Sequence, residues 1–185
     1  MSSQETLLKQ AHIALMKHPQ TALYAGVMLM GESAVEDGNF TAYTDGVNKK
    51  YCRQFLEKIT NPAKRRGLVL HENLHVALKQ LPRHLDFFKE NAKLANMAAD
   101  FVVNDIIYNI TGTIGNTPER IVELPDGALY DSMFHDWSMR QIWDHLKKQN
   151  PPPPPREGGS GDEPADDQGS GSGKIVINGL SLIHI

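Results

Sequence analysis

The 185-residue chain has only one cysteine and no long apolar run, and these two features exclude several classes of protein. Cys52 has no partner for an intramolecular disulfide, and the first ten residues (MSSQETLLKQ) lack the basic segment and apolar core of a signal peptide. No apolar stretch reaches the roughly 18 residues that cross a bilayer. We therefore expect a cytoplasmic protein that makes no membrane contact.

An excess of positive charge is missing as well. The chain has 19 basic and 22 acidic residues, and residues 151–174 alone carry five acidic and two basic ones, which leaves 17 of each sign elsewhere. A folded part with no net charge has little electrostatic attraction for polyanions. Nucleic acid is therefore not expected as a partner.

The composition changes abruptly after Asn150. Five consecutive prolines are followed by a stretch rich in glycine, serine and acidic residues, which is typical of an extended stem and a flexible linker. The last residues, IVINGLSLIHI, are apolar but too short to fold alone. We predict one domain over residues 1–150, a linker over 151–174, and a truncated or artefactual tail over 175–185.

Hydrophobic periodicity within residues 1–150 predicts an α+β domain in which a small, mostly antiparallel sheet is followed by helices. Helices are predicted over residues 5–17, 61–80 and 86–110, and a last one after Ser138, which forms a possible capping box with Gln141. Strands are predicted over residues 22–30, 40–44 and 47–55, with a hairpin turn at Asp45 and Gly46 between the last two.

The helix at residues 61–80 contains the sequence His71-Glu72-Asn73-Leu74-His75. Four residues advance a helix by about 400°, so the two histidines project from one face and can converge on one zinc ion. Glu72 lies about 100° away, where it can reach a water beside that ion and act as the general base. The helix is apolar nearly all round, and burying these polar groups without partners would be costly. One zinc ion per chain is therefore expected, with His71 and His75 as ligands and Glu72 as the catalytic residue.

Zinc with two histidine ligands needs a third protein ligand and an open position for water. His84 lies nine residues after His75, whereas metalloproteases that use a nearby third histidine place it six residues on. The alternative pattern, Gly-Thr-x-x-Asp, is not completed either, because the segment that starts at Gly112 ends in the amide of Asn116. A carboxylate from the helix at residues 86–110 remains.

Asp100 is the preferred third ligand. It lies in an otherwise apolar stripe of that helix, where a bare carboxylate would be costly unless a positive charge faced it. In the alternative, Asp100 only accepts a hydrogen bond from an imidazole, and the ligand comes from Glu90, Asp86 or Asp105.

Further polar side chains could support the centre. Asn96 and Asn104 are expected to hydrogen-bond around it rather than to bind the ion. A donor for the charge that develops on the substrate oxygen could come from His135, Tyr108, Tyr130 or Arg83, and the sequence does not choose among them.

Three segments resemble the putative metallopeptidase domain of bacterial and phage proteins: TDG at residues 44–46, LVLHENLHVAL at 68–78 and NMAADFVVND at 96–105. The resemblance implies a zincin-like fold, with a twisted sheet over an active-site helix and a second long helix that brings the acidic ligand. In that family the domain commonly precedes a von Willebrand factor A-like domain. Such a domain, or an associated ATPase, is therefore an expected partner.

Together these features predict a zinc-dependent metallopeptidase that hydrolyses peptide or protein substrates with a Glu72-activated water. The alternative is a catalytically silent zinc-binding scaffold that works with a von Willebrand factor A-like domain. The substitution Glu72→Gln distinguishes the two, because only the enzyme would lose a function by it.

Overall fold

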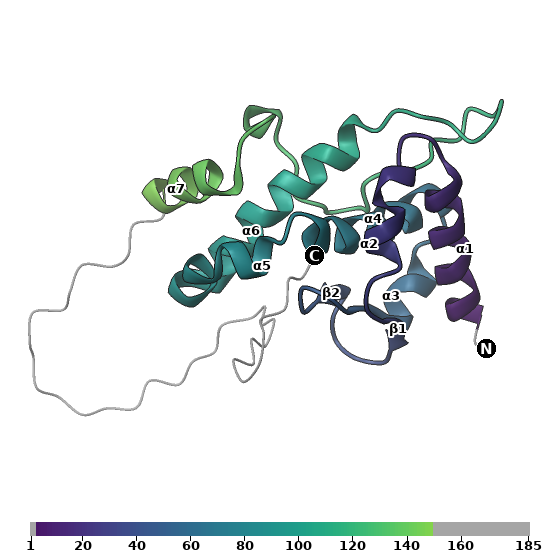
Figure 1. Cartoon of the computed structure of the whole chain (residues 1–185), viewed down its shortest axis with the longest axis horizontal. Helices are drawn as coiled ribbons and strands as arrows, with labels where there is room; N and C mark the ends of the chain where they lie inside the picture. The colour runs from purple at the N-terminus through teal and green to yellow at the C-terminus, as the bar shows by residue number, and fades with distance from the viewer. Residues whose placement is uncertain (1–2, 150–185) are drawn as a thin grey trace, which may run out of the picture.

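The computed structural model describes residues 3–149, which form a three-stranded sheet at one edge of the molecule and helices that pack against it (Figure 1). The predicted linker at 151–174 and tail at 175–185 lie outside the described residues. The elements in chain order are α1 (Ser3–Lys17), η1 (Ala22–Tyr24), α2 (Ala25–Met28), β1 (Ser33–Glu36), β2 (Ala42–Thr44), β3 (Lys49–Cys52), α3 (Arg53–Lys58), α4 (Pro62–Ala77), α5 (Gln80–Arg83), α6 (Leu85–Asn109), η2 (Ser132–Phe134) and α7 (Met139–Gln149).

The α+β class is confirmed, and the sheet has the order β1-β3-β2. β2 pairs with β3 in antiparallel register, with Thr44 opposite Lys49, and the predicted turn between them contains Gly46 at a φ of 94°. β1 pairs with the other edge of β3 in parallel register. The sheet is therefore mixed rather than mostly antiparallel, because the chain returns past β1 to place β3 beside it in the same direction.

The strand predicted over residues 22–30 is wrong. These residues form the short helices η1 and α2, and Leu23 and Leu29 are 72% and 74% exposed. The segment is rich in alanine, leucine and methionine, which favour helices, and an apolar run this short does not distinguish a helix from a strand. The strand predicted over 47–55 is shorter than expected, because the chain enters α3 at Arg53.

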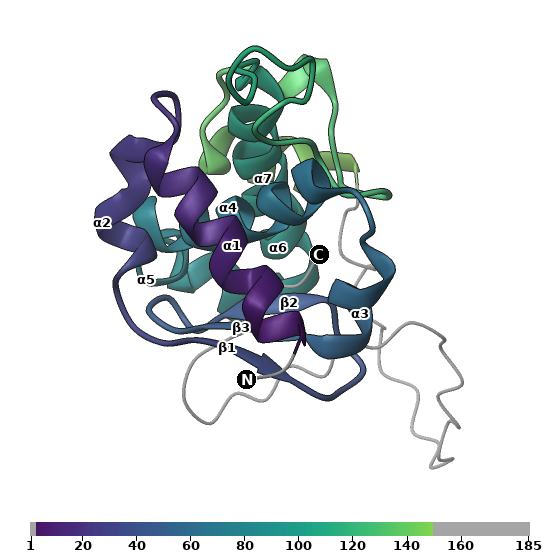
Figure 2. The same cartoon turned by 90° about the vertical axis from the view of Figure 1, so that its right-hand side faces the viewer.

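Helix α4 lies at the centre and packs against α1, α6 and β2 (Figure 2). It begins as predicted: the Asn61 side chain accepts a hydrogen bond from the backbone N–H of Ala63 at 2.8 Å, and Pro62 occupies the first turn. Its apolar side chains are fully buried at Leu68, Leu70 and Leu74. The helix ends at Ala77, earlier than predicted, because Lys79 takes a left-handed conformation with a φ of 51°.

Helix α6 packs against α4 and α7 (Figure 1). The contacts with α7 include the first half of α6, where Phe87 stacks on Trp143 and Glu90 pairs with Lys147. It covers nearly the predicted range, with a kink at Asn91, whose side chain accepts a hydrogen bond from the N–H of Leu94. The predicted capping box of α7 is confirmed, since Gln141 Oε1 accepts from the backbone N–H of Ser138 at 2.8 Å. No helix within residues 3–149 combines the length and apolar character that crossing a bilayer requires.

Gly67 allows close contact between α4 and the segment that follows α6. A Cβ atom at this position would lie 1.9 Å from the backbone oxygen of Glu123, which cannot rotate away as a side chain would. We expect Gly67→Ala to lower the free energy of unfolding by about 1–3 kcal/mol, although alanine is the better helix former. Urea unfolding measures this change.

Gly26→Ala is the matched control, because Gly26 also lies in a helix but has nothing within 4 Å of the added atom. It should leave the stability unchanged or raise it by up to about 1 kcal/mol. Equal stability of the Gly67→Ala and wild-type chains would contradict the close approach.

Candidate metal centre

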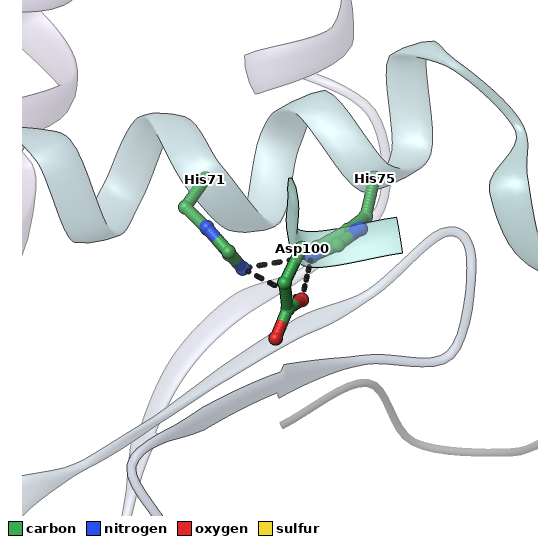
Figure 3. A group of neighbouring side chains, drawn as sticks. All are labelled: His71, His75 and Asp100. Carbon is green, nitrogen blue, oxygen red and sulfur yellow. Dashed lines mark hydrogen bonds and ion pairs between the residues drawn. The ribbon is translucent and has the colours of Figure 1, made fainter. Parts of the chain in front are cut away.

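Helices α4 and α6 bring three predicted ligands together in the core. His71 and His75 lie one turn apart on α4, and Asp100 reaches them from α6 (Figure 3). Asp100 Oδ1 lies 3.5 Å from His71 Nε2 and 3.4 Å from His75 Nε2, and the two Nε2 atoms are 2.8 Å apart. All three residues are buried. Their ligand atoms lie within 4.8 Å of one another, so one metal ion can contact all three.

Two amide side chains fix the protonation of the imidazoles. His71 Nδ1 donates a hydrogen bond to Asn104 Oδ1 at 2.9 Å, and His75 Nδ1 donates to Gln80 Oε1. The amide nitrogens are held elsewhere, since Asn104 Nδ2 donates to the Leu129 carbonyl at 2.8 Å and Gln80 Nε2 to the Ala99 carbonyl at 3.2 Å. The amide oxygens therefore face the rings, and they can only accept. An imidazole that donates from Nδ1 in this way and carries no second proton keeps a lone pair on Nε2, where a metal ion can bind.

This arrangement fits a cation. Two Nε2 atoms and a carboxylate oxygen converge at one point, and they attract one another only when a proton or a metal ion lies between them. Burial and the neighbouring His71 lower the pKa of His75, which keeps its ring neutral. Burial alone would raise the pKa of Asp100, but its contacts with the two imidazoles outweigh this and lower it, so the carboxylate stays ionised. His75 and Asp100 thus hold the protonation states that metal ligands need.

Glu72 is buried beside this group without a hydrogen-bond partner. Its side chain is fully buried, and neither of its carboxylate oxygens meets a donor among residues 3–149. Burial and then the negative charge of Asp100 raise the pKa of Glu72 well above its ordinary value. A carboxylate in such a setting takes up a proton readily, as a general base must.

The remaining predicted residues differ in whether they contact the two histidines. Asn104 contacts His71 directly, whereas Asn96 lies half-buried on α6, one turn before Asp100. Tyr108 stacks on Tyr130 near the end of α6. His135 has a 53% exposed side chain, and its Nδ1 pairs with Asp105 at 3.1 Å.

The alternative third ligands lie elsewhere. Asp105 belongs to a separate group with His135 and Asp136, and Glu90 pairs with Lys147 of α7. Asp86 is exposed in the first turn of α6. Among the carboxylates that the sequence offered, Asp100 is the one that the structure places against the two histidines.

Gln80 is the site residue that the sequence analysis missed. It is buried at the start of α5, and its position beside His75 depends on the left-handed turn at Lys79. Lysine has no preference for this conformation, so nothing in the local sequence indicated the turn. The only available signal was a glutamine, between Lys79 and Leu81, shortly after the second histidine.

The role of Gln80 can be tested with zinc as the probe. We expect Gln80→Leu to lower the zinc affinity about 10–100-fold, because the His75 ring loses the acceptor that fixes its orientation. Competition with a chromophoric chelator measures the affinity. Gln80→Glu keeps an acceptor at the same position and should bind zinc at least as tightly as the leucine variant. Equal affinities of the wild-type and leucine chains would rule out this role.

A family model described as "Putative metallopeptidase domain" matches residues 3–181 of the chain. No curated protein and no solved structure matches it. The match includes both helices of the centre.

Proposed function

The chain belongs to the putative metallopeptidase domain family, and on that premise we propose that it is a zinc-dependent peptidase. In this proposal His71, His75 and Asp100 hold the zinc ion, and Glu72 is the general base. The observation that carries it is the convergence of two Nε2 atoms and one carboxylate oxygen beside a buried Glu72 that meets no donor among residues 3–149. Two nitrogens and one oxygen are the donors of several catalytic zinc sites, in which the fourth position stays open.

The bound ion would supply Lewis acidity, making a water more acidic and polarising the scissile carbonyl. The chain's own residues do the rest. A Glu72 carboxylate oxygen takes the proton from the attacking water and delivers it to the nitrogen of the leaving amine. Asn104 and Gln80 keep both imidazoles oriented while this happens, since their nitrogens are tied to backbone carbonyls.

A catalytically silent scaffold is less well supported by the same observations. A buried carboxylate without a partner lowers the stability of the fold, by about 1–3 kcal/mol or more for a charged group. A protein that only needs the metal for structure gains nothing from such a group at position 72. A base that must remain free to receive a proton explains it.

The test is zinc-dependent cleavage of peptides by the full chain. The zinc-loaded protein should hydrolyse a mixed library of fluorogenic peptides, lose this activity with a chelator and regain it when zinc is restored. Protein that contains one zinc per chain but cleaves neither the library nor unfolded casein would overturn the proposal in favour of the scaffold. The expected von Willebrand factor A-like or ATPase partner can be added to the same assay.

A further inference from the structure

Two tyrosines form an exposed aromatic pair near the end of α6. Tyr108 of α6 and Tyr130 of the segment after it stack with their ring centroids 4.1 Å apart and their planes 21° apart. Tyr108 is 50% exposed, and Tyr130 is half-buried. The pair therefore presents aromatic surface to the outside, although neither ring belongs to the two hydrophobic clusters of the described residues.

The pair is connected to the metal centre through Asn104. Asp100, Asn104 and Tyr108 succeed one another at four-residue spacing along α6, so they lie on one face of the helix. Asn104 touches His71 with its oxygen and holds the Leu129 carbonyl with its nitrogen, at 2.9 and 2.8 Å. Leu129 directly precedes Tyr130. The same amide thus positions a proposed ligand and the backbone beside the tyrosine pair, with Tyr108 about 6 Å further along the helix axis.

Charged side chains of both signs lie around the pair. Arg120 donates to the Tyr108 carbonyl at 3.1 Å, and His135 pairs with Asp105 one turn before Tyr108. Asp131 next to Tyr130 accepts a hydrogen bond from the N–H of Met133. Asp105 and Asp131 both act electrostatically on Tyr130, so this surface offers stacking on the rings together with nearby negative charge.

We propose that Tyr108 and Tyr130 form the subsite that receives a flat side chain of the substrate, either an aromatic ring or a guanidinium group. This inference rests on the proposed peptidase function. Both kinds of side chain stack on a tyrosine face, whereas leucine and lysine have similar bulk without a flat π face. An extended peptide advances about 3.3 Å per residue. When its reacting carbonyl lies at the centre, a side chain one to three residues away from that carbonyl can therefore reach the pair.

The test uses zinc-loaded full chain and tripeptide hydroxamates, whose hydroxamate group binds the zinc directly. Phenylalanine, leucine, arginine, lysine or alanine stands at each peptide position in turn. At one position we expect the phenylalanine peptide to bind about 2–12-fold tighter than the leucine peptide, or the arginine peptide than the lysine peptide, from a stacking energy of about 0.5–1.5 kcal/mol. The two comparisons tell whether a ring or a guanidinium is preferred.

The variants Tyr108→Leu and Tyr130→Leu should lose this preference and bind the all-alanine hydroxamate as the wild type does. Tyr108→Phe keeps a ring and should keep the preference. The inference is overturned if the wild type shows no preference at any position, or if both leucine variants retain it. Failure of the all-alanine hydroxamate to bind the zinc-loaded wild type would instead reject the proposed centre, and the subsite with it.

Discussion

Replacing Glu72 by glutamine should reduce peptide hydrolysis about 10²–10⁴-fold while the chain still binds one zinc ion. Glutamine has nearly the same shape as glutamate but cannot accept the proton of the attacking water. Because the Glu72 oxygens have no partner among residues 3–149, the substitution breaks no hydrogen bond that holds the fold. Initial rates on the fluorogenic library, together with zinc content by atomic absorption, measure both quantities.

Glu90→Gln is the matched control for this experiment. Glu90 lies on α6 and pairs with Lys147 at the surface, away from the centre, so its loss should leave the rate unchanged. A Glu72→Gln chain that keeps its zinc and hydrolyses peptides at the wild-type rate would show that another group acts as the base.

Zinc should stabilise the wild-type chain by about 4 kcal/mol when its free concentration is a thousand times the dissociation constant. Asp100→Asn should reduce this gain to about 1.4 kcal/mol or less, because loss of an ionised ligand weakens binding by at least about 100-fold. Urea unfolding with zinc and with a chelator measures the difference. Asp105→Asn is the control, since Asp105 lies on the same helix but pairs with His135 instead.

The zinc-dependent increase in the free energy of unfolding should become smaller as the pH falls. A proton competes with the ion for each imidazole Nε2. Burial and His71 lower the pKa of His75 below its ordinary value of 6.5, so this competition is displaced to more acidic solution. The zinc-dependent stabilisation should therefore persist at pH 6.5 and disappear as the pH falls further. A gain that is already lost at pH 6.5 would contradict a lowered pKa.

The grouping of His71, His75 and Asp100 was largely predictable from sequence because it depends on helical spacing. His71 and His75 share a face of α4 by periodicity alone, and Asp100 was the carboxylate in an otherwise apolar stripe of α6. The positions of Gln80 and Tyr130 depend on chain reversals instead. Their partners are separated from them by non-helical segments, and no period in the sequence predicts where those segments lead.

The sheet shows the same division between local and distant pairing. The hairpin of β2 and β3 followed from the Asp45–Gly46 turn, because a tight turn fixes the register of its two strands. The parallel partner β1 was not predicted, since its pairing with β3 depends on contacts across a longer loop. The strand prediction for residues 22–30 was wrong for a different reason. Their apolar side chains show no helical or alternating period, so only composition could distinguish a strand from a helix.

Gln80 has a mechanical consequence for the two helices that it joins. Its oxygen holds His75 of α4, and its nitrogen holds the Ala99 carbonyl, one residue before Asp100 of α6. A chain of bonds thus runs from His75 through Gln80 and the Ala99 backbone to Asp100, whose carboxylate lies against the ring where the chain began. A sideways shift of α6 pulls on both of these side chains at once. We therefore expect His75 and Asp100 to move together when either helix shifts, so the geometry of the candidate centre depends on both helices.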